Sequence, residues 1–274
     1  MRTKQWCLLG LLPFAFANAA EKKPLPPPDP TANPLMITAG FLSWHPDLRF
    51  RLLGLEAMRG KQYEDAFKYF SRAAFYADKP SQGMVAEMLW NGQGVDKDHI
   101  LGYAWMDLAA ERGYAGFLGL RERYWNELDA GERTRALEVG QDIYARYGDA
   151  AAKPRIATQL RRGRKRVTGS RTGFAGNVQI YIPGPGSYEK IDGTKFYDPR
   201  YWDPDKYQQW HDSIWLKPRV GRVTVGEIEQ AGGKVAPPVG SRVRETAPDA
   251  DAVEPETPTT PEPSSLGTTP PPED

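Results

Sequence analysis

Apolar side chains recur at helical spacing through the middle of the chain and predict pairs of antiparallel helices. The helices of the first pair are expected over residues 47–59 and 62–77. Asp47 would cap the first helix, and Pro80 would end the pair. The apolar stripes comprise Leu48, Leu52, Leu55 and Met58 in the first helix, and Tyr63, Ala66, Phe67, Phe70, Ala73 and Ala74 in the second. One hairpin cannot bury both stripes, so we expect further hairpins to stack on it.

A glycine-rich turn lies inside the second pair, whose helices are expected over residues 82–91 and 98–112. Gly92 and Gly94 allow the positive φ angles that a tight turn needs. Asp98 is a suitable N-cap for the second helix, and Gly113 fits the left-handed position after its end. The residues expected between neighbouring hairpins are Trp105, Ala109 and Ala110.

A third pair begins near Ala115 with a helix to about Trp125. The helix after it has a capping-box pattern from Asp129 to Glu132, and Gly148 stops it. Three hairpins are about the minimum for a stable stack of this kind. We therefore place a helical array over residues 43–150.

The residues at the turns and between the helices resemble a known repeat. The pattern G-x-G-V-x-x-D is followed by a tryptophan, paired alanines and a glycine: Gly92, Gly94, Asp98, Trp105, Ala109, Ala110 and Gly113. A second set with matching order and spacing is Gly54, Ala66, Phe70 and Ala73. Ala73 and Ala109 lie 36 residues apart, a spacing within the range of helical repeats.

This pattern resembles the Sel-one-like repeat, a relative of the tetratricopeptide repeat with a longer loop between its helices. The resemblance implies an all-α fold, a short array of antiparallel helical hairpins. It also implies a protein-binding scaffold whose concave side is the binding surface. It names no catalytic, cofactor-binding or metal-binding residue.

The first 19 residues have the pattern of a secretory signal peptide. Arg2 and Lys4 form a basic start, a short apolar run follows, and small residues precede the expected cleavage before Ala20. A buried N-terminal helix is the alternative. We expect a periplasmic or secreted protein. The single cysteine, Cys7, lies in the signal, so the mature chain would have no disulfide or cysteine metal site.

Proline-rich sequence follows over residues 20–42 and predicts an extended linker. It is read as a plain spacer or, alternatively, as a proline-rich ligand for a partner.

Residues 151–172 form a basic segment, for which three interpretations compete. Its cations are Lys153, Arg155, Arg161, Arg162, Arg164, Lys165, Arg166 and Arg171, and Pro154 suits the first turn of a short helix. The segment is a solvated helix face that meets the chain's own acids, or it binds anionic lipid or cell-wall polymer, or it binds nucleic acid. Export and the lack of interleaved aromatic residues argue against nucleic acid, so none is expected as a partner.

Residues 173–230 form an aromatic-rich region of small α+β or irregular structure. Short strands are expected over residues 177–186 and 222–229 and could pair, and Asp203-Pro204 is a helix start. The aromatic residues form either a small core docked on the stack or a platform for a glycan or peptide. The platform would consist of Tyr197, Tyr201, Trp202, Tyr207, Trp210 and Trp215.

The end of the chain, residues 231–274, is rich in proline and acid, and we expect it to be disordered. Its acids from Thr246 onward would contact the basic segment transiently, without fixed docking.

No catalytic arrangement is visible in the sequence. The three histidines, His45, His99 and His211, lie far apart, so no helical metal pair exists. His211, Asp212 and Ser213 are adjacent and would point in different directions on one helix. We predict a non-enzymatic, exported scaffold for protein–protein interaction in the cell envelope, without cofactor. The alternatives are a cell-wall or glycan binding module that uses residues 197–215, and an unrecognised hydrolase.

Overall fold

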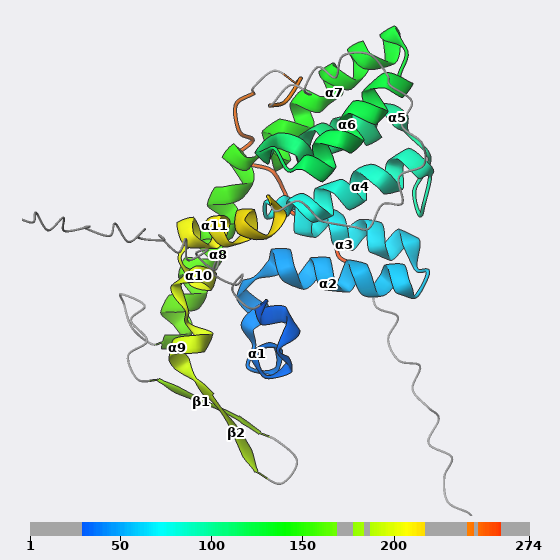
Figure 1. Cartoon of the computed structure of the whole chain (residues 1–274). Coiled ribbons are helices and arrows are strands. Elements are labelled where there is room, and N and C mark those ends of the chain that lie inside the picture. Colours follow the sequence, from blue (N-terminus) through cyan, green and yellow to red (C-terminus); the bar gives the residue numbers. More distant parts are fainter. Residues whose placement is uncertain (1–28, 169–177, 184–186, 217–239, 244–245, 259–274) are drawn as a thin grey trace, which may run out of the picture.

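The structure, a computed structural model, describes residues 29–168, 178–183, 187–216, 240–243 and 246–258. It is mostly helical, and successive helices pair and stack as antiparallel hairpins (Figure 1). The predicted all-α array of helical hairpins with a C-terminal extension that contains short strands is therefore confirmed. The expected signal peptide and the strand over residues 222–229 lie outside the described residues.

The first hairpin consists of α2 (Pro46–Arg59) and α3 (Tyr63–Phe75). Gly54 lets the two helices approach, because a Cβ atom there would lie 2.6 Å from the ring of Phe70. The prediction that Asp47 is the N-cap of α2 is wrong. The cap position belongs to His45, and Asp47 lies buried in the first turn, where the hydroxyl of Tyr207 donates to it.

The second hairpin consists of α4 (Lys79–Asn91) and α5 (His99–Ala109), followed by the 3-10 turn η3 (Ala110–Arg112). The first of these helices begins before residue 82 because the Asp78 carboxylate caps it by accepting from the Ser81 amide. Asp98 caps α5 through the Leu101 amide, as predicted. The three glycines of the turns, Gly92, Gly94 and Gly113, have φ angles of 68°, 73° and 73°.

The third hairpin consists of α6 (Ala115–Glu127) and α7 (Ala130–Tyr147), which follow each other along the chain and both pack on α5. The capping box is present: Asp129 accepts from the Glu132 amide, and the Glu132 carboxylate accepts from the Asp129 amide. Gly148 ends the helix with a φ of −62°, so it acts as a break without the left-handed conformation.

The basic segment belongs to a longer helix than expected, α8 (Asp149–Thr168). Pro154 lies inside this helix rather than in its first turn. One face is buried, with Ala152, Ile156 and Leu160 in the core. The helix continues the packed structure beyond residue 150 and contacts α2, α10 and α11.

The C-terminal extension contains an antiparallel hairpin and three short helices. Strand β1 (Gln179–Pro183) pairs with β2 (Tyr188–Asp192), with Ile180 opposite Ile191, so its partner differs from the expected residues 222–229. The helices α9 (Gly193–Phe196), α10 (Pro199–Trp202) and α11 (Pro204–Trp215) follow. Asp203 caps the last of these, as predicted.

The end of the expected extended linker is helical instead. It contains η1 (Pro30–Ala32), α1 (Pro34–Thr38) and η2 (Phe41–Trp44). The cause lies in local capping and in tertiary contact: Asp29 and Asn33 cap the first two turns, and Phe41 is buried. His45 joins this region to α10, with its ring nitrogens each 2.8 Å from the carbonyl oxygens of Phe41 and Tyr201.

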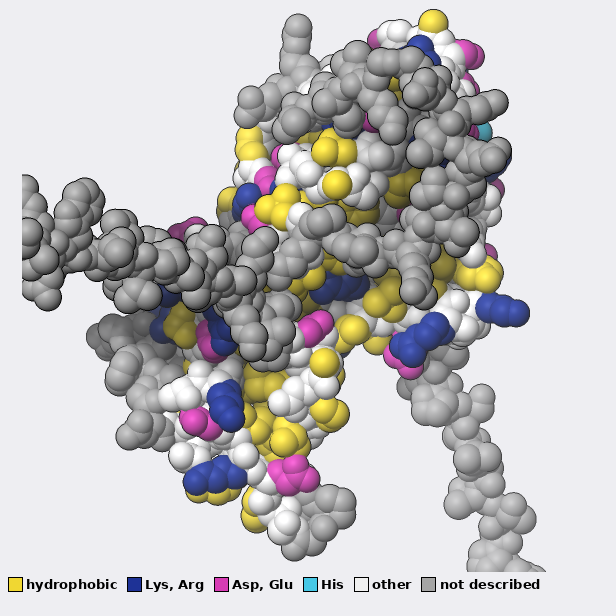
Figure 2. Space-filling view, viewed as in Figure 1, with side chains coloured by type: hydrophobic (Ala, Val, Ile, Leu, Met, Phe, Trp, Pro, Cys, Tyr) yellow, Lys and Arg dark blue, Asp and Glu magenta, His cyan; other side chains and the backbone are white. Residues whose placement is uncertain are grey.

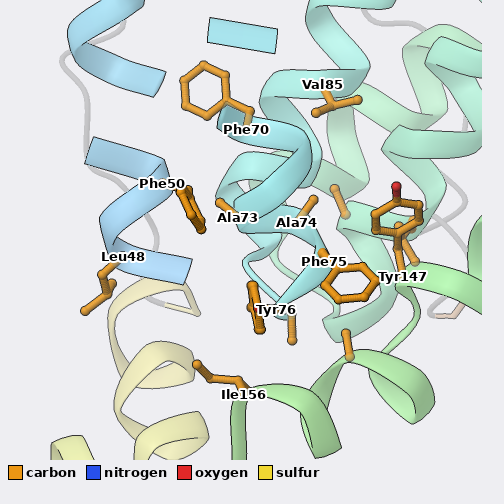
Figure 3. Close-up of a cluster of buried hydrophobic side chains, with 14 of the residues drawn as sticks. Leu48, Phe50, Phe70, Ala73, Ala74, Phe75, Tyr76, Val85, Tyr147 and Ile156 are labelled. Atoms are coloured by element: carbon orange, nitrogen blue, oxygen red, sulfur yellow. The ribbon is translucent and has the colours of Figure 1, made fainter. Parts of the chain in front are cut away.

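A continuous hydrophobic core links the hairpins (Figure 3). Phe50, Phe70 and Val85 come from the first two hairpins, Tyr147 comes from the third, and Ile156 comes from α8. Among the described residues, no helix is long and apolar enough to span a bilayer.

Residues 246–258 are docked on the helices, where a disordered tail was expected. The Asp249 amide donates to the Ala145 carbonyl at 2.7 Å, and Glu254 pairs with Arg72 at 2.6 Å. Glu254 therefore binds to α3. From the basic segment, Arg155 donates to the Asp249 carbonyl at 3.0 Å. Fixed polar contacts replace the transient charge attraction that the composition predicted.

Candidate binding groove

The first helices of the three hairpins and α11 together form a groove of about 530 Å³, here called the central groove. The sequence gives each helix its place: the hairpin repeat aligns α2, α4 and α6, and the Asp203 cap starts α11. Lining residues are Arg51, Leu52, Leu55, Phe70, Pro80, Gly83, Met84, Glu87, Phe117, Trp210, His211, Ile214 and Trp215, with Asp29 and Thr31 at the N-terminal side.

Specific polar contacts hold α11 against the stack. The Tyr207 hydroxyl donates to Asp47 at 2.6 Å, in the buried first turn of α2. The Tyr114 hydroxyl donates to Asp212 at 2.5 Å. These bonds join residues 160 and 98 positions apart, so the groove exists only when the C-terminal extension returns to the repeats.

The groove wall is largely apolar. Gly83 leaves room for Phe117, since a Cβ atom on Gly83 would lie 2.6 Å from that ring. Trp215 stacks on Phe117 with the ring centroids 5.9 Å apart. Leu55 has 40% of its surface exposed. An apolar partner segment could bury this surface, and burial of such area is the main source of affinity in grooves of this kind.

Charges at the groove are paired or suppressed. Arg51 binds Asp78 at 2.7 Å, and this ion pair joins α2 to the start of α4. Burial raises the pKa of Glu87 and lowers the pKa of His211 well below its ordinary value. His211 is therefore neutral at pH 7.

Behind the groove lies a buried acid that the sequence pattern did not reveal. Burial and the charge of Asp78 raise the pKa of Asp47 to about 7. His211 Nε2 lies 3.7 Å from the Asp47 carboxylate. The only sequence signal was an aspartate beside a proline at a helix start, which is read as a cap.

The repeat residues lie at turns and in helix interfaces, and Phe70 among them also lines the central groove. Ala66, Phe70, Ala73, Ala109 and Ala110 are fully buried, and Trp105 packs on Tyr147 with the ring centroids 4.6 Å apart. Gly94 has no room for a side chain, because a Cβ atom would collide with the Tyr63 backbone. These residues build the stack that positions the groove.

Most of the proposed aromatic platform lies in the interior. Tyr197, Tyr201, Trp202, Tyr207 and Trp210 are buried, with Trp202 1% exposed, and Trp215 is half-buried in the groove. Phe41 and His45 pack among these rings. A glycan platform needs exposed ring faces, so this cluster corresponds to the other interpretation, a small core docked on the stack.

The adjacent triad-type residues have separate partners. Asp212 accepts from Tyr114, and the Ser213 hydroxyl donates to the Trp210 carbonyl at 2.7 Å. In the described part of the chain, no three histidine, cysteine or acidic residues gather as a metal site requires.

Comparison with known proteins identifies the repeat. The Sel1 repeat model matches residues 52–74 and 80–114, which lie in the first and second hairpins. No curated protein and no solved structure matches the chain significantly. Sel1 repeats are helical repeats that generally mediate protein–protein interactions and are typically not catalytic. The chain therefore contains Sel1 repeats, in its first and second hairpins.

Proposed function

We propose that the protein is a non-enzymatic, exported scaffold that binds a segment of another cell-envelope protein in the central groove. The observation that carries this proposal is the apolar wall of the groove, in which Leu55, Met84 and Phe117 come from three successive hairpins. Such a wall suits the apolar side of a helix or extended segment. Export is supported by the signal-like residues 1–19.

Site-specific photo-crosslinking tests the groove directly. A photoreactive amino acid replaces Leu55 in the groove or, as a matched control, Ile37 on α1. The two side chains are similarly exposed, at 40% and 37%, but Ile37 does not line the groove. We expect a discrete adduct with one envelope protein from position 55 and none from position 37.

Leu55→Glu should reduce capture of the same partner by about tenfold, because it places a charge against an apolar surface. Ile37→Glu should leave capture unchanged. The captured scaffold should begin near Ala20. Identical adducts from both positions would contradict groove binding, and an intact Met1 would contradict export.

A second candidate function, binding of anionic lipid or cell-wall polymer, is favoured by the outer face of α8. Arg161, Arg162, Lys165 and Arg166 are exposed there, opposite the buried face of the helix. Elsewhere, in the view of Figure 2, cationic and anionic side chains are interspersed. Clustered cations beside a surface of negative charge each contribute about 1 kcal/mol to binding.

A further inference from the structure

Residues 240–243, Gly-Ser-Arg-Val, lie against α5, α6 and α7, outside the central groove. In Figure 1 the described C-terminal pieces, drawn in orange, lie near α7. The described chain before this segment ends at Leu216, so 23 residues, 217–239, connect the two.

A buried ion pair forms hydrogen bonds with the backbone of the segment. Asp107 of α5 and Arg121 of α6 are both fully buried, with their charged groups 3.5 Å apart. Arg121 donates to the Gly240 carbonyl, and Asp107 accepts from the Ser241 hydroxyl and from the Arg242 amide at 3.2 Å. A buried ion pair is costly to form without additional partners, and the segment adds to those that Tyr144 and Glu122 supply.

The arginine of the segment has a fitted receptor. Both terminal nitrogens of the Arg242 guanidinium donate to the Glu122 carboxylate, at 2.9 and 2.5 Å. The guanidinium also lies 4.7 Å from the ring centroid of Trp125 and 3.4 Å from the Tyr103 hydroxyl. A planar fork satisfies these partners together, whereas a lysine ammonium would act as a single point charge.

The next side chain fits a notch that one glycine creates. Val243 is 6% exposed and packs over Gly140 of α7, where a Cβ atom would lie 2.6 Å from a Val243 methyl. From Gly240 to Val243, the site therefore offers polar partners for the backbone, then an acidic and aromatic pocket for the arginine, and then an apolar notch for the valine. These features distinguish a peptide-recognition site from incidental contact of a loop with the surface.

We propose that this surface of α5, α6 and α7 is a peptide-binding site that recognises an extended Ser-Arg-aliphatic segment, and that the chain's own residues 240–243 occupy it. Because the segment belongs to the same chain, its binding is intramolecular, and modest affinity is enough for occupancy. A free peptide of the same sequence competes for the site. The site shares α6 with the central groove but none of its lining residues.

Amide hydrogen exchange in the full-length protein tests occupancy. The Arg242 and Val243 amides should be protected, and Arg242→Lys or Glu122→Gln should reduce that protection about tenfold or more. Arg133→Lys is the matched control. Arg133 lies over the same Trp125 ring, at 5.2 Å, but it donates a hydrogen bond to the Trp125 carbonyl rather than to Glu122. Its variant should retain the protection, and exchange as fast as in an unfolded peptide in the wild type would overturn the proposal.

Peptide binding tests recognition. A fluorescent peptide with the sequence of residues 238–246 is titrated into the full-length wild type and the Arg242→Lys variant. Since the variant's own segment competes less, we expect about tenfold tighter binding to it than to the wild type. A peptide with lysine at the arginine position should bind about tenfold more weakly. Absence of binding to the variant at millimolar peptide, or equal binding of both peptides, would overturn the proposal.

Discussion

Asp47 lies at the start of α2, where Tyr207, Asp78, Arg51 and His211 surround it. Its ordinary pKa of 3.8 applies to the unfolded chain, and burial raises the pKa to about 7 in the folded protein. Between these values the folded protein binds more protons than the unfolded chain. The contribution of Asp47 to the free energy of unfolding is therefore full below about pH 4 and is lost as the pH rises to about 7.

Asp47→Asn should accordingly be more stable, relative to wild type, at pH 8 than at pH 5. The expected change in this difference is about 1–3 kcal/mol, because each pKa unit corresponds to about 1.4 kcal/mol. Burial lowers the pKa of His45 to about 4. This shift changes the free energy of unfolding with pH in the opposite direction, but it does so in both the wild type and the variant and therefore cancels from the difference. Urea unfolding at the two pH values measures the difference. A pH-independent difference would mean that Asp47 is charged in the folded protein at both values.

At the scale of the element, α8 illustrates which features a local pattern can and cannot provide. Its helical character and exposed cations were predictable from residues 153–171. Its buried face was not predictable. The small residues Ala152, Ala157 and Gly163 cannot be recognised as buried positions until their packing partners are known. A Cβ atom on Gly163 would overlap Trp44 and Trp202, which lie far away in the sequence.

Gly163→Ala should therefore destabilise the protein, even though alanine favours helix by about 1 kcal/mol over glycine. Overpacking against the two tryptophans costs about 1–3 kcal/mol, which exceeds that gain at the upper end. Gly119→Ala on α6 is the control, since nothing lies within 4 Å of its added Cβ atom, and it should stabilise the protein. Thermal unfolding compares the two variants. An equal gain in melting temperature would show that α8 does not pack tightly on η2 and α10.

For the whole molecule, repeat spacing predicted the stack but not the course of the C-terminal third of the chain. Trp105 and Ala109 belong to the repeat. Each repeat unit packs on the next one, so the 36-residue spacing predicts which helices are neighbours. Contacts such as Tyr207 with Asp47 and Glu254 with Arg72 pair residues that share no local signal. As a result, the central groove, which needs α11, could be predicted only as a concave surface of the stack.

The docked C-terminal segment also changes the expected role of the basic face. Glu254 pairs with Arg72, and the described contact of the tail with α8 is between Arg155 and the Asp249 carbonyl. The exposed cations Arg161, Arg162, Lys165 and Arg166 lie nearer the C-terminal end of the helix than that contact. If α8 binds an anionic surface, these four side chains carry the binding, and residues 246–258 do not regulate it.

Changing all four to glutamine should abolish sedimentation of the protein with vesicles that contain anionic lipid, at low salt. The wild type should bind and dissociate as salt rises toward 1 M, where the Debye length falls to about 3 Å. The control changes Arg59, Lys61 and Lys68 instead, exposed cations on the first hairpin, and should sediment as the wild type does. Neutral vesicles should bind none of the proteins. Equal sedimentation of both variants would show that net charge, rather than the face of α8, causes any attraction, and this would remove lipid and polymer binding as a function of that helix.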